Sequence, residues 1–261
     1  MPTLTRSRLA MVSLQTLLWK ECLRFLRIWS QTLLPPVITM TLYFVIFGKF
    51  IGSQIHHIDG YAYIQYISPG LILMSVMTNA YANTASSFFT TKFNKSIEEM
   101  LVSPMPNYII LLGYMLGGTL RGMLVGGLVL CVALLFTHIP VAHPLIVVSM
   151  ALFSAAVFSL GGLINGIFAR RFDDIAFIPT FVLTPLTYLG GVFYSIKQLP
   201  PLWRSISIIN PVLDMVNTFR YGLLDVTDLS IASGFILIVG FLVTLFCWAL
   251  ILLNKGIGVK I

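Results

Sequence analysis

The residues that usually perform chemistry in proteins are few in this chain and lie outside its apolar segments. All nine acidic residues fall outside the predicted membrane spans or at the ends of these spans. His138 and His143 are separated by a turn containing Pro140, which is a poor scaffold for a metal site, and His56 and His57 lie in another loop. Hydrolytic or metal chemistry needs paired carboxylates or clustered ligands. The sequence therefore predicts no catalytic residue and no metal site.

Two further classes of chemistry are also disfavoured. No segment matches G-x-x-x-x-G-K-[ST], the loop that holds nucleotide phosphates, so we expect no cofactor in this chain. Ion-coupled transporters generally place Asp, Glu or His within their membrane spans, and the expected positions of these residues argue against proton coupling. An ion-coupled secondary transporter and a non-transporting membrane scaffold remain as alternative functions.

One short polar segment between the second and third predicted spans has the residues of a short helix. Ser96 and Glu99 have the spacing of a capping box, and Pro104 and Pro106 are expected to end the helix that follows. The result would be a short, rigid helix with an acidic face and an apolar face. The residues of this helix that we follow below are Ser96, Glu98, Glu99, Met100 and Leu101.

Long apolar segments must position these polar residues. The chain has 261 residues, of which 57% are hydrophobic and 10% are Asp, Glu, Lys or Arg, whereas soluble domains carry about 25% charged residues. A helix needs about 20 apolar residues to cross a bilayer. We therefore expect an all-α integral membrane protein that forms one domain over residues 1–261. Six transmembrane helices are predicted, at 33–50, 63–91, 108–136, 145–168, 175–191 and 231–253.

The placement of Lys and Arg predicts how the chain is oriented. Cytoplasmic loops of membrane proteins carry an excess of these residues. With the N-terminus inside, eleven fall on the cytoplasmic side and four outside, so both termini are expected in the cytoplasm. The net charge of +7 follows from this asymmetry and favours anionic lipids over nucleic acid as partner. The expected parts are a cytoplasmic segment (1–30), the six-helix membrane domain (31–253) and a cytoplasmic tail (254–261).

Residues 9–29 predict an amphipathic helix in the plane of the lipid headgroups. Lys20, Arg24 and Arg27 lie on one of its faces, and basic amphipathic helices bind membrane surfaces. A plain membrane anchor and an additional partner contact are the two interpretations. The expected apolar face consists of Leu14, Leu18, Cys22, Phe25 and Trp29.

The outer segment 192–230 is too apolar for an ordinary loop and too interrupted for a span. Asn210 is a good N-cap and Pro211 suits a first helical position. Irregular backbone at membrane depth must be covered by protein or line a water-filled cavity, so we expect a re-entrant hairpin between the fifth and sixth helices, with an interfacial loop as the alternative. Its marker residues are Pro200, Pro201, Asn210, Pro211 and Arg220.

A few polar side chains fall within the predicted spans. Arg121 is the one full charge expected deep in a span, where lipid exposure would cost at least about 2.5–3.5 kcal/mol; it should therefore face helices, carbonyls or water, in a structural or a substrate-binding role. Glycines around it should allow close helix approach. The remaining candidates for a pathway or a helix interface are Thr39, Tyr43, Asn79, Asn83, Thr184, Thr187 and Tyr188.

Several stretches together resemble the type-2 ABC transporter permease family, over essentially the whole chain. The segments on which this resemblance rests are PTFVLTPLTYLGGVFY at 179–194, followed by Leu199-Pro200, Asn210-Pro211 and Phe219-Arg220-Tyr221. WSQTLLPPVITMTLYF at 29–44 and NAYAN at 79–83 are most similar to the YadH-type inner-membrane permeases of Gram-negative bacteria.

This resemblance implies partners that the residues do not show. Members of the family pair as dimers and bind two copies of a separate ABC-type ATPase, which holds ATP and Mg. It also implies that the helix at 96–101 is the coupling helix pressed into the ATPase, and that the chain is a non-catalytic exporter subunit of the bacterial inner membrane. The segment Arg170–Asp174 is interpreted as a solvated charge cluster or a second ATPase contact. The substrate stays open among drugs, lipids and glycans.

Overall fold

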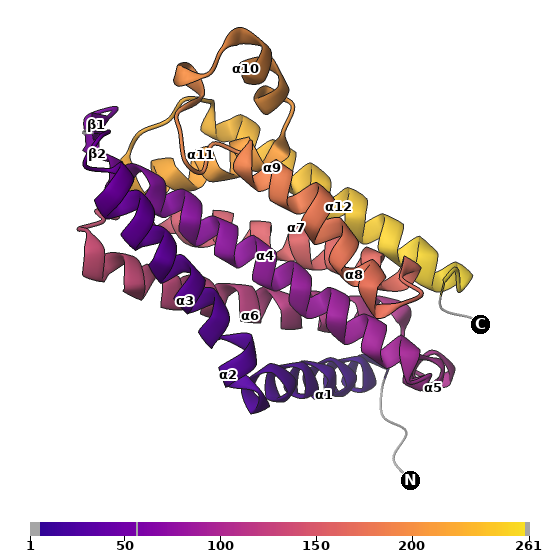
Figure 1. Cartoon of the computed structure of the whole chain (residues 1–261). Coiled ribbons are helices and arrows are strands. Elements are labelled where there is room, and N and C mark those ends of the chain that lie inside the picture. Colours follow the sequence, from indigo (N-terminus) through magenta and orange to yellow (C-terminus); the bar gives the residue numbers. More distant parts are fainter. Residues whose placement is uncertain (1–5, 56, 259–261) are drawn as a thin grey trace.

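The structure is a computed structural model that describes residues 6–55 and 57–258, and it is built almost entirely of helices (Figure 1). The only strands among these residues form a two-stranded antiparallel hairpin in which His57 pairs with Ala62. The helices, in chain order, are α1 (Arg6–Arg27), α2 (Trp29–Thr32), α3 (Leu34–Tyr43), α4 (Tyr63–Phe93), α5 (Ser96–Val102), α6 (Asn107–Phe136), α7 (Pro144–Phe168), α8 (Phe172–Ile178), α9 (Thr184–Tyr188), α10 (Pro201–Ile208), α11 (Pro211–Leu224) and α12 (Ile231–Lys255).

Short irregular segments connect several of these helices. π-Helical turns continue α3 as η1 (Phe44–Ile51) and join α8 to α9 as η2 (Pro179–Leu183), while a 3-10 turn, η3 (Ile196–Gln198), precedes α10. The strands are β1 (His57–Ile58) and β2 (Tyr61–Ala62). Proline at the first position of η2 has no N–H to donate, which favours a break in regular α-helical bonding there.

Four helical stretches among the described residues are long and apolar enough to cross a membrane, namely Trp29–Ile51, Asn107–Phe136, Pro144–Phe168 and Ile231–Lys255. They coincide with four of the six predicted spans. The other two predicted spans correspond to α4, which is long but more polar, and to the continuous helical arm α8–η2–α9. The protein is thus a mostly helical, integral membrane protein with apolar helices, and the count of six spans stays a prediction.

The central helix is α4, and it packs most extensively against α7 and α6. Small residues on α6 allow this approach, as predicted from its glycines: a Cβ atom on Gly122 would lie 2.7 Å from the carbonyl oxygen of Val76 in α4. Several polar side chains of α4 are satisfied by its own turns, as when Ser75 donates to the carbonyl of Ile72 at 2.8 Å. Because α4 contains many Ser, Thr and Asn residues, its hydropathy is low for a membrane span, although most of the helix is buried.

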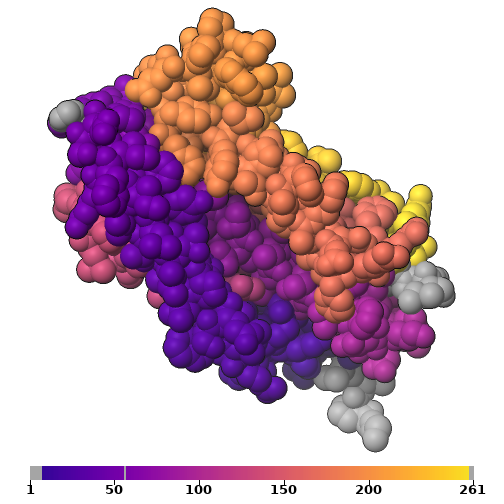
Figure 2. All heavy atoms as spheres, in the orientation of Figure 1, coloured from indigo at the N-terminus to yellow at the C-terminus, as the bar shows by residue number. Residues whose placement is uncertain are grey.

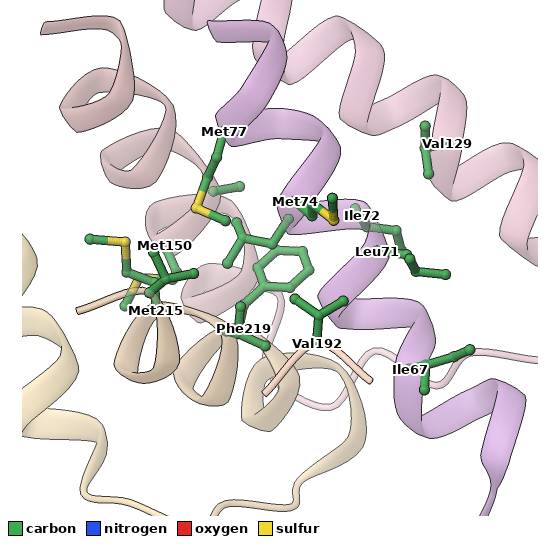
Figure 3. Close-up of a cluster of buried hydrophobic side chains, with 14 of the residues drawn as sticks. Ile67, Leu71, Ile72, Met74, Met77, Val129, Met150, Val192, Met215 and Phe219 are labelled. Atoms are coloured by element: carbon green, nitrogen blue, oxygen red, sulfur yellow. The ribbon is translucent and has the colours of Figure 1, made fainter. Parts of the chain in front are cut away.

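The largest hydrophobic core lies between α4, α6, α7 and α11 (Figure 3). Met215 and Phe219 project from α11 toward Met74 and Met77 of α4. Twelve of the fourteen residues of α11 are buried, which shows that this helix is part of the packed interior and not a surface segment.

The bundle has two distinct ends (Figure 1). The end that carries α5 and the last turn of α12 is called the α5 end. The opposite end, which carries α10 and the β-hairpin, is called the α10 end. Helix α1 runs along the side of the bundle from the α5 end to α2, where the chain turns and continues as α3, which packs mainly against α6.

Candidate functional site

Arg121 in α6 supplies a hydrogen bond that the first span cannot make for itself. In a continuous helix the Thr32 carbonyl would accept the N–H of residue 36, but Pro36 has no N–H. The Arg121 Nη2 atom donates to this carbonyl at 3.1 Å. The chain bends at the same place, between α2 and α3. Arg121 therefore contacts a carbonyl, as its position in a span required.

The position of the Arg121 guanidinium along the bundle is marked by the residue whose carbonyl it contacts. Its partner Thr32 stands near the beginning of the apolar stretch Trp29–Ile51. Helix α6 has 30 residues, which gives it a length of about 45 Å against a hydrocarbon thickness of about 30 Å. A residue halfway along α6 can therefore reach the boundary at which another span begins, and the side chain of Arg121 does so.

A group of polar side chains joins α1 to α4 next to Arg121. Ser87 Oγ donates to Glu21 Oε1 at 2.7 Å, and Arg24 Nη2 lies 3.2 Å from Glu21 Oε2. Arg24 Nη2 also donates to Asn83 Oδ1 at 2.8 Å, and Arg121 Nη1 approaches the same oxygen at 3.4 Å. We call these five residues, Glu21, Arg24, Asn83, Ser87 and Arg121, the elbow cluster.

The elbow cluster shows an unexpected burial and corrects the predicted apolar face of α1. Glu21 lies outside the predicted spans, as expected, but its side chain is fully buried. The buried stripe of α1 consists of Leu17, Glu21 and Phe25, whereas the predicted apolar face of this helix included Trp29, which is exposed. The stripe is set by packing against α6 rather than by apolar character alone.

Glycines on α6 explain why this stripe can contain a carboxylate. A Cβ atom on Gly117 would lie 2.7 Å from the Cβ atom of Glu21, and one on Gly113 would collide with Leu17. The two glycines are one turn apart and form a groove that accepts α1 at close range. Close approach brings the Glu21 carboxylate within reach of Ser87 on α4.

Arg220 is a second buried arginine, at the α10 end, with only 2% of its surface exposed. Its Nε atom donates to the Tyr66 carbonyl at 3.2 Å, and its Nη2 atom donates to the Gly191 carbonyl. The guanidinium also lies over the Tyr66 ring, 4.1 Å from the ring centroid, a cation–π arrangement. Arg220 thus connects α11, α4 and the turn after α9.

The α10–α11 hairpin has the local structure that its residue types predict. The side chain of Asn210 accepts the N–H of Val212 at 3.0 Å, and Pro211 occupies the first helical position. The amide of Asn210 also donates to the Leu186 carbonyl at 2.6 Å, which ties the start of α11 to α9. Pro200 is the N-cap of α10 and Pro201 its first residue.

An ion pair closes the loops at the α10 end. Lys197 Nζ lies 2.7 Å from Asp228 Oδ1, and Ser195 donates to Asp228 Oδ2 at 2.9 Å. The hydrogen bond and the charge of Asp228 raise the pKa of Lys197. The segment that precedes α10 is therefore bound to the segment that follows α11.

Of the predicted pathway residues described here, Tyr43 and Tyr188 meet, whereas the others do not gather at one site. Tyr43 and Tyr188 meet through their hydroxyl oxygens, 3.3 Å apart, and Phe193 packs against both rings. Asn79 instead donates to the Ser75 carbonyl of its own helix at 2.9 Å. The threonines likewise do not gather at a common site: Thr39 and Thr184 are exposed, and Thr187 is buried and bonds to the Thr184 carbonyl.

The short helix α5 forms where the sequence predicts it but begins differently. Ser96 is its first residue, and the N-cap is Lys95 in a left-handed conformation (φ 60°) without a side-chain cap, so the capping-box prediction is wrong. The helix ends at Val102, because the residue before Pro104 is extended. Ile97 is buried and fixes α5 to the bundle. Exposed side chains are Glu98, Glu99 and Val102, whereas Met100 and Leu101 pack partly against the protein's own core.

The charged segment between α7 and α8 is organised by its own backbone. The N–H groups of Arg170 and Arg171 donate to Asp174 Oδ2 at 2.8 and 2.9 Å, which lowers the pKa of Asp174. Nearby, Lys92 Nζ donates to the carbonyls of Ile167 and Ala169 at the end of α7. Lysine at a helix C-terminus satisfies unpaired carbonyls, so Lys92 joins α4 to α7 here.

Sequence reasoning missed Glu21, Arg24 and Ser87 as one site. The spacing of Leu17, Glu21 and Phe25 on one helical face was the available signal, together with glycines four apart on α6. Within the part of the chain that the structure describes, no group of three His, Cys, Asp or Glu side chains is placed to hold a metal ion. The buried polar contacts are suited to holding helices in register rather than to bond-making chemistry.

Comparison with known proteins places these features in a family. A model of the ABC-2 type transporter family matches residues 12–224. The inner membrane transport permease YadH of Escherichia coli K12 is 52% identical over 248 residues, which cover 94% of this chain and 97% of YadH. Nodulation protein J of Rhizobium leguminosarum bv. viciae is 26% identical over 202 residues, or 74% of this chain and 76% of that protein.

Proposed function

Because this chain belongs to the ABC-2 type transporter family, we propose that it is the membrane subunit of an ATP-driven exporter. ATP and Mg would bind to a separate ATPase, and this chain would move an amphipathic substrate, such as a lipid, drug or glycan, across the inner membrane. The observation that carries the proposal is the family match over most of the chain, together with an exposed acidic helix at one end of the bundle.

The proposed membrane topology has six spans with both termini in the cytoplasm. Helix α4 and the arm α8–η2–α9 would be the second and fifth spans. The α5 end would face the cytoplasm, which agrees with the excess of Lys and Arg there. The α10–α11 hairpin would be re-entrant: the burial of α11 among α4, α7 and α12 satisfies the requirement that irregular backbone at membrane depth be covered by protein.

The proposed contact with the ATPase is α5. Glu98 and Glu99 are exposed at the tip of the bundle, and Ile97 holds the helix against the protein so that a force on α5 reaches α4 and α6. Beside it, a hollow of about 840 Å³ is lined by residues of α1, by the α5–α6 link, including Pro104, and by Tyr108 in the first turn of α6. This hollow could receive a protruding side chain of the ATPase.

A second copy of the chain is the other proposed partner. The face formed by α3 and the arm α8–η2–α9 is hollowed along its length, with α4 between them (Figure 2). Large apolar side chains are exposed along both walls, among them Ile38, Leu42, Phe177 and Phe181. Tyr43 and Tyr188 bridge the walls near the α10 end. Two such faces placed together would enclose a path lined by aromatic and neutral polar groups.

Reconstitution with a candidate ABC-type ATPase from the same organism tests the proposal. We expect the two proteins to co-purify and the chain to stimulate ATP hydrolysis in proteoliposomes. The Glu98→Lys/Glu99→Lys variant should reduce both co-purification and stimulation at least about tenfold, because two exposed charges of the contact are reversed. Asp59→Lys, which alters an exposed acid at the opposite, α10 end of the bundle, is the matched control.

Two outcomes would contradict this assignment. If the doubly reversed variant bound and stimulated the ATPase normally, α5 would not be the contact. If the chain alone accumulated a solute in vesicles from a pH or sodium gradient, it would be an ion-coupled transporter. Glu21 and Asp214 are the buried acids that such a mechanism would use, so Glu21→Gln and Asp214→Asn would then abolish the uptake.

A further inference from the structure

The face of α1 that points away from the bundle carries a hollow of about 550 Å³. Three cationic side chains line it, Lys20, Arg24 and Arg27. Large apolar side chains border the same hollow and are themselves exposed: Trp19 (67%), Leu23 (42%) and Ile28 (41%). This volume lies within the range of small-molecule sites in proteins.

The charge of this hollow is not balanced within the helix. Glu21 is the only acidic residue of α1, and it is turned inward to Ser87 and Arg24. Among the residues that line the hollow there are three cations and no carboxylate. An anion would therefore meet an uncompensated positive field next to apolar side chains, a combination that suits an amphiphile with a negative headgroup.

The position of the hollow fixes where that anion would come from. Ile28 borders the hollow and directly precedes Trp29, at which the apolar stretch Trp29–Ile51 begins. The hollow thus stands at the level where the first span meets the membrane surface on the α5 side. Lipid headgroups are the anions that occur at this level, and exposed Trp side chains are typical of it.

Arg24 belongs to this hollow and to the elbow cluster at the same time. One of its guanidinium nitrogens contacts Glu21 and Asn83, while its Nε atom is buried without a hydrogen-bond partner, as is the Nε atom of Arg121. Arg24 and Arg121 share a single acceptor, Asn83 Oδ1. A phosphate that attracted Arg24 would weaken the hydrogen bond from Arg24 to Asn83 Oδ1 and leave this oxygen to Arg121. The contact between α1 and α4 would then loosen or shift.

We propose that this hollow binds the headgroup of an anionic phospholipid, and that Arg24 transmits its occupancy to α4. The site goes beyond the proposed transport function, since it requires neither the ATPase nor a substrate. Lipid binding at this site would make α1 sensitive to the charge of the surrounding lipid. The elbow cluster would respond to that binding.

Native mass spectrometry of the purified full-length chain tests the site. Phosphatidylglycerol is titrated into the protein in detergent, with phosphatidylcholine as the uncharged comparison and glycerol phosphate as the headgroup without chains. The Lys20→Gln/Arg27→Gln variant should bind phosphatidylglycerol at least about tenfold more weakly, since each surface cation contributes roughly a factor of five to binding of anionic lipid. Both side chains are exposed, so the variant should fold normally.

A matched variant controls for net charge. Lys95→Gln/Lys255→Gln removes two exposed cations at the same end of the bundle and should change the affinity less than twofold. Hydrogen exchange then tests the transmission: phosphatidylglycerol should alter exchange in residues 80–87 of α4 in the wild type but not in Arg24→Gln.

Four results would overturn the inference. They are unchanged phosphatidylglycerol binding by Lys20→Gln/Arg27→Gln, an equal loss in the control variant, equal binding of phosphatidylcholine, and displacement of the lipid by glycerol phosphate at equal concentration. If the Lys20→Gln/Arg27→Gln variant kept its lipid binding and lost co-purification with the ATPase, the hollow would be a protein contact instead.

Discussion

Two arginines inside this bundle, Arg220 and Arg121, both need hydrogen-bond acceptors for their charged groups, but they use different kinds of acceptor. Arg220 is almost completely buried, and its donors go to two backbone carbonyls and to the face of one aromatic ring. Arg121 is only partly buried; it donates to one backbone carbonyl, that of Thr32, and shares the side-chain acceptor Asn83 Oδ1 with Arg24. Carbonyls are fixed by the backbone, whereas a shared side-chain acceptor can be redistributed. Arg220 therefore fastens the α10 end, and Arg121 belongs to a cluster with more than one possible arrangement.

Removing Arg220 is the strongest test of this contrast. Arg220→Met leaves the Gly191 carbonyl without this donor, which costs about 1–3 kcal/mol, and removes the hydrogen bond from a charged group to the Tyr66 carbonyl, which is worth about 1.5–3 kcal/mol. We expect the folded protein in detergent to lose roughly 2–6 kcal/mol of stability, measured as a large fall in the temperature of unfolding and in the yield of monodisperse protein. Arg220→Lys should recover only part of this loss, because lysine lacks the planar fork. Wild-type stability in Arg220→Met would show that this arginine does not fasten the α10 end.

Arg121 is expected to have a smaller effect that a second substitution reverses. Arg121→Ala leaves the Thr32 carbonyl without a donor and should cost about 1–3 kcal/mol. Pro36→Ala restores an N–H at the position that normally bonds to this carbonyl, so the cost of Arg121→Ala should fall in that background. A double-mutant cycle on thermal unfolding measures the coupling. Strictly additive effects would mean that Arg121 does not replace the donor that Pro36 lacks.

The docking of α1 gives the smallest predicted effect. Gly117→Ala forces its new Cβ atom against Glu21 and should cost about 1 kcal/mol, the lower end of overpacking effects, because α1 can shift outward. Gly127→Ala on the same helix meets no atom within 4 Å and should be neutral or slightly stabilising. Hydrogen exchange of α1 should rise in the first variant only. Equal exchange in both would show that close packing of α1 on α6 does not hold the elbow cluster together.

Local features of this protein were largely predictable. The N-cap at Asn210, the end of α5 before Pro104 and the close approach at Gly122 each follow from one residue type and its neighbours. The capping box at Ser96 failed because the chain reverses direction at Lys95, and the left-handed conformation there places Ser96 inside the first turn. The turn at Lys95, which connects α4 to α5, therefore decided how the short helix begins, and the local motif at Ser96–Glu99 did not.

The predicted binding residues were harder to place, because a polar side chain in a predicted span can bond either to its own helix or to another helix. Asn79 and Asn83 are one turn apart on α4, yet Asn79 bonds to its own helix and Asn83 accepts from two arginines of other helices. Nothing in their local sequence distinguishes them. Likewise, Tyr43 and Tyr188 meet although they are 145 positions apart.

The sequence by itself determined that this is a helical membrane protein, because long uncharged apolar runs leave the backbone no partner in lipid except its own helix. It also determined where helices break, since proline and glycine act through the backbone of their own segment. Only the tertiary structure decided that Glu21 points inward, that Arg121 compensates for the N–H that Pro36 lacks, and that α11 is buried. These depend on which helix faces lie together, and that is settled by packing between residues far apart in the chain.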